Sequence, residues 1–383
     1  MKLILNCLFI FNLLFCSEIV FVANEGNFGA SNGTISMIFN DGTIIESDPM
    51  GDVVQALEVY GDKLIVLINN SHKLKIFDIT PEGIALPGIE ISTNGSGPRD
   101  LVIVNEKIYF SNYSSQDIKI FSLETYSIEE SIPVNGLPED IEYDGNYLWV
   151  TIPHSDFYFS SGSNVLKIDP ITNSIIEIID VGYGPQQIAF SNGDVFVSRT
   201  FYDESWNTFH GTSKIISEDG SLEVQSIEYG AGSPCGGSVL NHQNSIYRSF
   251  NGGLAAINQD LSLSETTIGN FDQSMVYHVE KIDGKFWFGI TNFIDLNKVY
   301  VLDENGSQIS SYDTGLFPGD FAIWKEDYNI GDINEDALIN LLDIILLVNI
   351  ILFDSENEMG DINMDDFINI LDIIFIVNLI LNN

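Results

Sequence analysis

A four-strand unit is repeated along most of this 383-residue chain and constrains its fold more than any other feature of the sequence. The clearest copy covers residues 97–134, where the runs DLVIV, KIYFSN, DIKIFSL and SIEESIPV alternate apolar and polar side chains. Turn-forming residues such as Asn105 and Ser114 separate these runs. Similar openings begin at residues 52, 137 and 184, and weaker ones at 234 and 274. Their spacing of roughly 40–50 residues is the length of one β-propeller blade.

The two ends of the repeated region complement each other. FPGDFAIWKED, residues 317–327, has the pattern of a single first strand, whereas EIVFVANEG from Glu18 has the pattern of a second strand. TISMIFNDG and TIIESDP then supply a third and a fourth strand. Joining these runs completes a seventh blade and closes the ring, which removes exposed sheet edges. We therefore predict an all-β, seven-bladed β-propeller over residues 18–328, rather than an irregular sandwich of many strands.

Two acidic loops follow the repeats. GDINEDALINLLD at 331–343 and GDINMDDFINILD at 360–372 place oxygen-bearing side chains at positions 1, 3, 5, 9 and 12 of a twelve-residue loop, with a backbone carbonyl expected at position 7. The predicted ligands are Asp332, Asn334, Asp336, Leu338, Asn340 and Asp343 in the first loop, and Asp361, Asn363, Asp365, Phe367, Asn369 and Asp372 in the second. This spacing is typical of EF-hand-type loops, so we predict two calcium ions rather than solvated acidic turns.

The negative charge of the chain also favours cation binding. Residues 331–383 contain eleven Asp and Glu and no Lys or Arg, so this segment repels itself unless cations neutralise it. Metal binding and folding are therefore expected to be coupled. The whole chain has a formal net charge of −40, which argues against nucleic acid or an anionic membrane as a partner, because binding to either needs clustered cations.

The paired loops resemble a type I dockerin module over residues 330–383, because both copies keep the arrangement GD-N-D---N--D. Residues 18–327, with FVANEGNFGASNGTIS near their start, resemble bacterial surface or exported propellers of the YVTN type. The dockerin resemblance implies calcium binding and attachment to a cohesin-like protein. The chain departs from that family at loop position 6, where Ala337 and Asp366 replace glycine.

A second departure concerns the surface that would meet the partner. Loop positions 10 and 11, where many dockerins carry a Ser-Thr pair, are apolar here, and we call these residues the docking face: Leu341, Leu342, Ile370 and Leu371. In the following LLDIILLVNIIL, ten of twelve residues are apolar, which is more than a module of this size can bury. Part of that surface is therefore expected to contact a partner.

The N-terminal residues MKLILNCLFIFNLLFCS have the short apolar run and small final residues of a secretory signal, with cleavage expected near Ser17. The run is too short to stay as a membrane span, so no transmembrane segment is expected in the mature chain. The predicted organisation is a signal peptide at 1–17, the propeller at 18–328 and the dockerin-like domain at 329–383. We expect the protein outside the cell or on its surface; a lipoprotein linked through Cys16 and a periplasmic location are the alternatives.

Candidate ligand residues gather in two stretches between second and third strands, 151–164 and 198–214. We call five of their side chains the ligand rim: Tyr158, Arg199, Tyr202, Trp206 and His210. Aromatic rings with polar neighbours suit flat ligands such as sugars, although they could instead cover blade edges. First-strand residues are expected at the channel mouth, namely Arg99, Asp100, Glu139, Asp140, Gln186 and Gln187.

The sequence carries no catalytic motif, since its five histidines are scattered and neither H-E-x-x-H nor G-x-S-x-G occurs. We therefore interpret the chain as a binding protein and assign no catalytic residue. Two alternatives stay open: a propeller glycoside hydrolase or lyase acting on extracellular polysaccharide, and a self-associating surface-layer protein.

Overall fold

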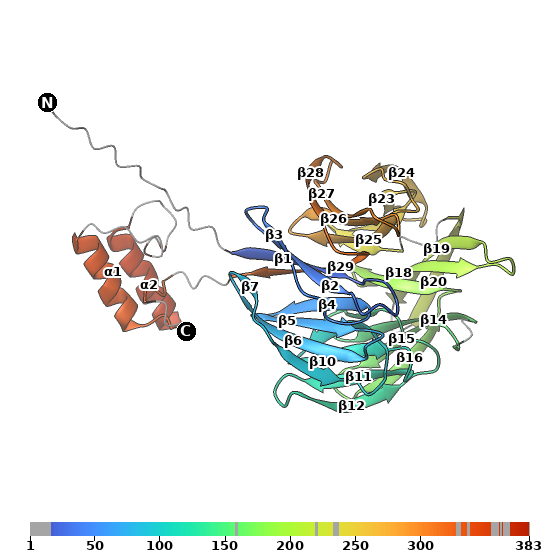
Figure 1. Ribbon diagram of the computed structural model, residues 1–383, viewed down its shortest axis with the longest axis horizontal. Coiled ribbons are helices and arrows are strands. Elements are labelled where there is room, and N and C mark those ends of the chain that lie inside the picture. The colour runs from blue at the N-terminus through green and yellow to red at the C-terminus, as the bar shows by residue number, and fades with distance from the viewer. Residues whose placement is uncertain are drawn as a thin grey trace. The chain divides into compact units, whose positions relative to one another are not determined.

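The fold of the chain is a β-propeller followed by two helices (Figure 1). Our computed structural model describes residues 17–157, 160–218, 221–232, 237–326, 331–334, 338–353, 360, 362 and 368–382. Within these residues, 29 strands form seven antiparallel sheets, one for each blade. The predicted seven-bladed propeller and the small helical C-terminus are confirmed.

The strands follow the order expected from the repeats, including all four that were predicted in 97–134. From the innermost strand outward, the first three blades after the N-terminal strands are β4 Val54–Tyr60, β5 Lys63–Ile68, β6 Lys73–Thr80 and β8 Ile89–Ser92, with β7 Gly83–Ile84 also on β6; β9 Pro98–Val104, β10 Lys107–Asn112, β11 Asp117–Ser122 and β12 Ser127–Pro133; and β13 Ile141–Tyr143, β14 Leu148–His154, β15 Ser161–Asp169 and β16 Ser174–Asp180. The next three blades are β17 Pro185–Ser191, β18 Asp194–Tyr202, β19 Thr208–Glu218 and β20 Ser221–Ala231; β21 Val239–His242, β22 Ser245–Phe250, β23 Gly253–Ile257 and β24 Leu263–Ile268; and β25 Val276–Ile282, β26 Lys285–Thr291, β27 Asn297–Leu302 and β28 Gln308–Asp313. The closing blade combines β29 Pro318–Lys325 with β1 Glu18–Asn24, β2 Thr34–Phe39 and β3 Ile44–Glu46.

The place of a strand in its blade explains its sequence. The second strand β10, KIYFSN, has five of six residues buried, because neighbouring sheets cover both of its faces. The outermost strand β12, SIEESIP, buries only Ile132, and its charged side chains protect the exposed edge. The turn between β9 and β10 has φ values of 50° at Asn105 and 60° at Glu106, as a two-residue type I′ hairpin requires.

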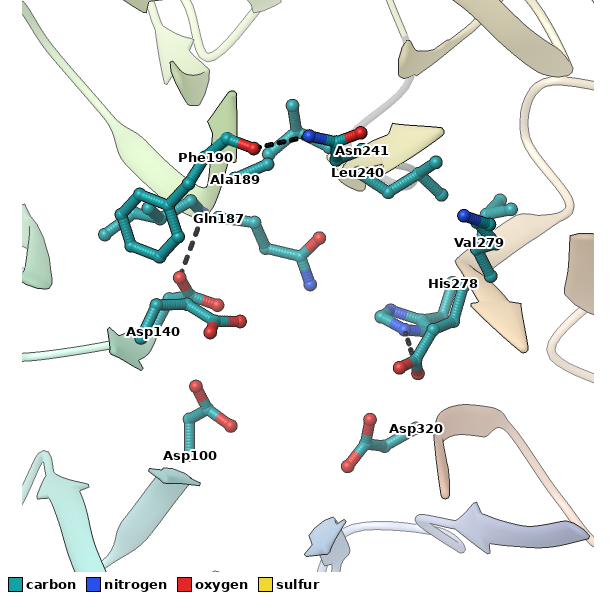
Figure 2. A pocket seen from close by; sticks show the side chains of 15 residues that line it. Asp100, Asp140, Gln187, Ala189, Phe190, Leu240, Asn241, His278, Val279 and Asp320 are labelled. Atoms are coloured by element: carbon teal, nitrogen blue, oxygen red, sulfur yellow. Dashed lines mark hydrogen bonds and ion pairs between the residues drawn. The ribbon is translucent and has the colours of Figure 1, made fainter. Parts of the chain in front are cut away.

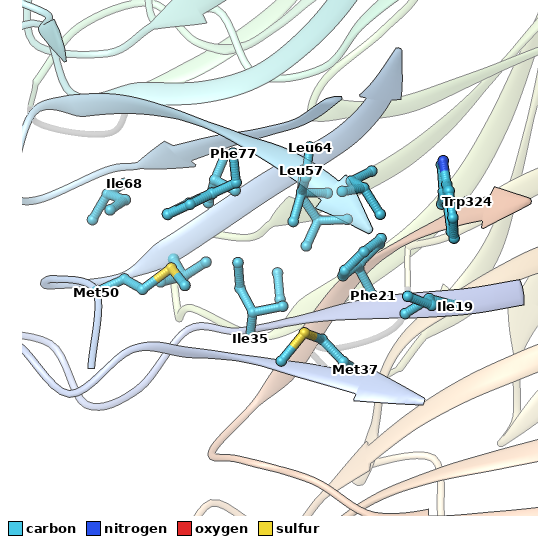
Figure 3. Close-up of a cluster of buried hydrophobic side chains, with 14 residues drawn as sticks. Ile19, Phe21, Ile35, Met37, Met50, Leu57, Leu64, Ile68, Phe77 and Trp324 are labelled. Atoms are coloured by element: carbon cyan, nitrogen blue, oxygen red, sulfur yellow. The ribbon is translucent and has the colours of Figure 1, made fainter. Parts of the chain in front are cut away.

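Strands from opposite ends of the chain close the ring, as predicted, because β29 lies beside β1 in one sheet. Figure 3 shows Trp324 of β29 in a buried cluster with Phe21 of β1 and Leu57 of the next blade. On the other side of the closing blade, Phe321 packs in a second cluster with Trp287 of β26. Buried apolar side chains therefore hold the closing blade to both of its neighbours.

The two stretches that were predicted to be long rim loops are mostly strand. Loops were expected at 151–164 and 198–214, but β14 continues to His154, β15 begins at Ser161, β18 continues to Tyr202 and β19 begins at Thr208. Antiparallel pairing persists through these residues up to the pair Tyr202 and Thr208. The connections are therefore 155–160 and 203–207, and the predicted loop boundaries were wrong.

The contacts within the chain separate the propeller, Glu18–Trp324, from a unit that includes the C-terminal residues from Lys325 onward. In this unit α1, Leu341–Phe353, and α2, Ile370–Asn382, bury Leu347 and Ile376 in a shared apolar core. The predicted boundary between residues 328 and 329 lies outside the described residues and stays a prediction. No helix in the described part of the chain is long and apolar enough to cross a membrane.

Candidate functional site

Side chains from the innermost strands line a cavity in the central channel. Equivalent positions of three blades hold Asp100, Asp140 and Asp320, each two residues after a proline. The corresponding positions of two other blades hold Gln187 and His278. These five residues border one cavity of about 440 Å³, and Figure 2 shows their side chains around the same hollow.

The three aspartates also join neighbouring blades. Asp100 Oδ2 accepts a hydrogen bond from the backbone N–H of Ile141 at 2.8 Å, and Asp140 Oδ2 accepts one from Ile188 at 2.9 Å. Asp320 Oδ2 accepts the equivalent bond from the next blade at 2.7 Å, which crosses the closure of the ring. Each carboxylate is thereby fixed in orientation, with one oxygen used between blades.

The channel is strongly acidic. Five of its lining carboxylates, which we call the channel acids, are Asp100, Asp140, Glu142, Glu280 and Asp320. Burial, reinforced by the negative charge of Asp100, raises the pKa of Glu280 to about 8. Burial also raises the pKa of Asp100 to about 6, although backbone N–H donors act against this shift. Burial and neighbouring carboxylates hold the pKa values of Asp140, Glu142 and Asp320 well above the usual range. Like charges in a confined space therefore favour bound protons or cations.

A basic residue near the channel acids is already paired. Arg99 Nε donates to Glu139 Oε1 at 3.1 Å and Arg99 Nη1 donates to Gln55 Oε1 at 2.6 Å. The guanidinium also lies 4.8 Å from the ring centroid of Tyr113, whose hydroxyl donates to Glu139. A cavity of about 120 Å³ lies here, and its lining includes all the residues predicted for the channel mouth: Arg99, Asp100, Glu139, Asp140, Gln186 and Gln187.

Two residues of the ligand rim lie together at a separate pocket. Tyr202 and Trp206 border a hollow of about 280 Å³, which also contacts Asp203 and Glu204. Their side chains are 38% and 70% exposed, and their ring centroids are 6.0 Å apart. Tyr158, a third predicted rim residue, lies outside the described residues. The structure thus provides an exposed aromatic pair beside a pocket.

The 203–207 turn holds Trp206 in place. Asp203 Oδ1 accepts hydrogen bonds from the backbone N–H groups of Ser205 and Asn207, both at 2.8 Å, and its Oδ2 accepts one from the Asn207 side chain at 2.8 Å. The N–H of Trp206 donates to the Asp203 carbonyl at 3.0 Å. The hydrogen bonds that the carboxylate accepts from Asn207 and Ser205 lower the pKa of Asp203, so it stays ionised and keeps the turn ordered.

The other two predicted rim residues are buried, which corrects their expected place on the surface. Arg199 is 3% exposed, and its Nη2 donates to the Ile227 carbonyl at 3.1 Å. His210 is 1% exposed, and its Nδ1 lies 2.9 Å from Nη2 of the buried Arg248. Both lie within paired strands rather than in a loop. Gly211 lies opposite Arg199 across the paired strands and leaves room for its side chain. The sequence pattern did not indicate this role for the glycine.

In the C-terminal unit, the aspartates predicted at loop position 12 bind backbone groups of their own loops. Asp343 Oδ1 accepts from the N–H of Ile333 and its Oδ2 from the N–H of Asn340, both at 2.8 Å. Asn340 caps α1 with its own side chain, so the two residues form a capping box. Asp372 and Asn369 repeat this arrangement before α2. Both aspartates are fully buried.

The remaining calcium ligands are only partly described. Asp332 is 4% exposed, Asn334 is half-buried, and the carbonyl of Leu338 accepts a hydrogen bond from the Asn340 side chain at 3.1 Å. The predicted ligands outside the described residues are Asp336, Asp361, Asn363, Asp365 and Phe367. The first loop therefore buries Asp332 and Asp343 in a segment without basic residues, and buried carboxylates of this kind fit a calcium ion.

The docking face is exposed. Leu341 and Leu342 are 66% and 55% exposed, and Ile370 and Leu371 are 64% and 48% exposed. The next turn of each helix continues the apolar surface through Ile345, Leu346, Ile374 and Phe375. Each helix thus buries one face in the shared core and leaves a second apolar face in contact with solvent.

Comparisons with known proteins support the propeller fold. The sequence matches no protein family and no curated protein. A Lactobacillus plantarum protein superposes with a TM-score of 0.59 at 12% identity, covering 80% of this chain and 99% of that one. A candidate 6-phosphogluconolactonase from Bacteroides uniformis gives 0.58 at 15% identity, covering 81% and 100%. A hypothetical selenium-binding protein from Sulfolobus tokodaii gives 0.58 at 10% identity, covering 82% and 93%. At these identities the similarity concerns the fold alone.

Proposed function

We propose that the protein is a secreted or cell-surface binding protein. Its propeller recognises a glycan at the Tyr202–Trp206 pocket, and its C-terminal module attaches it to a cohesin-like partner. The observation that carries the first half is the exposed, closely spaced aromatic pair beside a hollow. Aromatic faces bind the apolar faces of sugar rings, while neighbouring carboxylates accept hydrogen bonds from hydroxyl groups.

The backbone at Trp206 determines how the indole ring is presented. Its φ of 64° lies in the left-handed region, which costs a bulky residue about 1–3 kcal/mol. The hydrogen bonds of Asp203 hold this conformation and present the indole ring to solvent. Glycine or asparagine would occupy the position without strain. Positive φ also occurs at the exposed Tyr126 and Phe293, so the proposal rests on the exposed ring pair beside the pocket rather than on this strain.

The pocket suits one unit of a longer chain. Its volume of about 280 Å³ is at the lower end of the range for small-molecule pockets, roughly 300–1,000 Å³. The half-exposed Tyr202 and the exposed Trp206 extend the surface beyond the hollow. A polysaccharide could therefore place one sugar in the pocket and a neighbouring sugar on the indole ring.

Calcium would act on the C-terminal module. Asp332, Asn334, Asp336, Leu338, Asn340 and Asp343 would hold one ion, with the matching residues of the second loop holding another. Each ion supplies the positive charge that the segment lacks. Because Asp343 and Asp372 also bind backbone N–H groups, they would couple the metal to the first turn of each helix. The exposed docking face would then bury its apolar side chains against the partner.

A second candidate function is a glycoside hydrolase or lyase. The specific observation in its favour is the set of channel acids with raised pKa values, because glycoside hydrolysis needs a carboxyl group that stays protonated near neutral pH. The binding function is preferred because the exposed pair of aromatic rings lies at the Tyr202–Trp206 pocket, whereas Phe190 borders the channel cavity without such a partner ring among its described lining residues.

A screen with the full-length protein tests the proposal. Calcium-loaded protein is applied to a glycan array and to insoluble polysaccharides, and the bound fraction is measured. Binding that is lost with Trp206→Ala, without new reducing ends or unsaturated sugars, supports recognition by the pocket. Release of such products would establish the enzyme function instead. Binding unaffected by Trp206→Ala would place the ligand elsewhere.

A further inference from the structure

Two neighbouring blades bring an imidazole and two carboxylates together inside the channel. His278 and Glu280 are alternate residues of β25, so both face the same side of that strand, and Asp320 comes from β29 in the next blade. Potential ligand atoms of the three side chains all lie within 4.8 Å of one another. Figure 2 shows His278 and Asp320 facing the same hollow. We call these residues the channel triad.

The spacing of the channel triad fits one metal ion. Nitrogen and oxygen ligands lie about 2.0–2.4 Å from divalent ions, so ligands on opposite sides of an ion are separated by at most about 4.8 Å. The His278 Nε2 and Glu280 Oε2 atoms are 3.6 Å apart, too far for a hydrogen bond and suitable for two ligands of one ion. The adjoining cavity of about 440 Å³ leaves space for further water or substrate ligands.

The surroundings favour a cation. Asp100 contributes a further negative charge that acts on both carboxylates of the channel triad. Arg99 is already held by Glu139 and Gln55. Lys281 also borders the cavity, and burial together with the Lys281 charge lowers the pKa of His242 on the preceding blade. The channel therefore combines excess negative charge with a nitrogen ligand, which distinguishes it from a cluster of acids alone.

We propose that the channel triad binds a divalent first-row transition metal, of the Zn²⁺ or Mn²⁺ class, between the blades that close the ring. The imidazole favours these ions over calcium, which takes oxygen ligands. The channel triad includes none of the predicted calcium ligands and none of the residues that line the Tyr202–Trp206 pocket, so it does not depend on the proposed function. An ion held by β25 and β29 also crosslinks two blades near the closure of the ring.

Metal titration of the full-length protein tests the inference. The protein is first treated with chelator, then held in excess calcium so that the C-terminal loops are occupied, and titrated calorimetrically with Mn²⁺ or Zn²⁺. Glu280→Gln removes one ligand, whereas Glu142→Gln is a matched control, because Glu142 occupies the same position of β13 and borders the same cavity. X-ray absorption of the zinc-loaded wild type and of His278→Gln detects the imidazole ligand without relying on a single variant.

One ion per chain is expected, with at least about tenfold weaker binding in Glu280→Gln and near wild-type binding in Glu142→Gln. The absorption spectrum should contain one imidazole nitrogen, absent from His278→Gln. Equal weakening by the two glutamine variants would mean that diffuse negative charge attracts the ion, and would overturn the site. Absence of stoichiometric binding by the wild type, or a zinc spectrum without nitrogen, would do the same.

Discussion

Trp324 donates a hydrogen bond from its indole Nε1 to Oδ1 of Asp62 at 2.9 Å, although the two residues are 262 positions apart in the sequence. The bond joins β29, the last strand of the propeller, to the turn between β4 and β5. Trp324 is 4% exposed and also packs against apolar residues of both blades. The closure of the ring therefore combines apolar burial with directed polar contacts, the Trp324–Asp62 bond and the bond from the Leu57 N–H to Asp320.

Replacing Trp324 tests how much this closure contributes. Trp324→Ala leaves a cavity and an unpaired Asp62, so we expect a loss of about 3–5 kcal/mol of unfolding free energy. Trp324→Phe keeps most of the apolar contact and should lose only about 1 kcal/mol. Urea unfolding in calcium, followed by far-ultraviolet circular dichroism, measures both. Equal, small effects would contradict the importance of the closure.

Calcium removal should loosen the C-terminal helices and leave strand β10 of the propeller unchanged. Without ions, the acidic loops repel one another, so backbone amides in Leu341–Phe353 and Ile370–Asn382 should exchange with solvent much faster after chelation. Amides of β10 serve as the internal control, because that strand lies in the propeller. Hydrogen exchange with mass spectrometry of the full chain measures both regions. Unchanged exchange in the helices would disprove the coupling of calcium to folding.

The docking face can be separated from the helical core by substitution. Because Leu341, Leu342, Ile370 and Leu371 are all about half exposed or more, changing them to Ser should leave calcium binding intact. Binding to a cohesin-like domain should fall at least about 100-fold, through loss of apolar burial. Leu347→Ser is the contrasting variant, because Leu347 is fully buried and its loss should unfold the module. Unchanged partner binding by the surface variant would exclude this face.

The channel acids and Glu58, a neighbouring carboxylate of β4, should make the metal-free propeller less stable as the pH rises. The folded-state pKa of Glu280 is raised from 4.5 to about 8, and that of Glu58 from 4.5 to about 7, so the folded state binds more protons than the unfolded state between these values. Stability should therefore be lost as the pH rises from about 4.5 to about 8. The lowered pKa of His278 has the opposite effect on stability, because this group destabilises the folded state as the pH falls below about 6.5.

Thermal unfolding in chelator across this pH range checks the expectation. The melting temperature should fall by roughly 2–4 °C for each kcal/mol lost, and Glu280→Gln should flatten the dependence because it removes one of the titrating groups. The other channel acids still titrate in this variant, so part of the pH dependence should remain. A melting temperature that rises steadily from pH 5 to pH 8 would contradict the sign of the effect.

The repeats predicted the fold because each blade repeats the same balance of buried and exposed strands. The motif Pro-x-Asp followed by an apolar residue marks Asp100, Asp140 and Asp320, and it could have located the channel aspartates in advance. Only the first two were singled out, because the last blade is split between the two ends of the chain. His278 and Glu280 could not be found this way, since their blade keeps neither the proline nor the aspartate.

The ligand rim was predicted less well for a local reason. Sequence alone favoured loops around Arg199 and His210, since aromatic and polar residues are mixed there. In the structure, pairing of β18 with β19 continues through both residues and buries them. Whether a strand continues depends on such cross-strand partners, which are distant in sequence. Tyr202 instead ends β18 and Trp206 lies in the 203–207 turn, where both border a pocket.

The proposed recognition of a glycan depends on the indole ring of Trp206, so the most direct measurement compares polysaccharide affinity in two matched variants. Trp206→Ala removes the exposed ring at the pocket, and Tyr126→Ala removes another exposed aromatic residue with positive φ, at the turn before β12. Depletion binding to the polysaccharide identified in the screen should weaken at least about tenfold for Trp206→Ala, which loses ring stacking, and stay unchanged for Tyr126→Ala. Equal affinity of both variants and the wild type would contradict ligand recognition at this pocket.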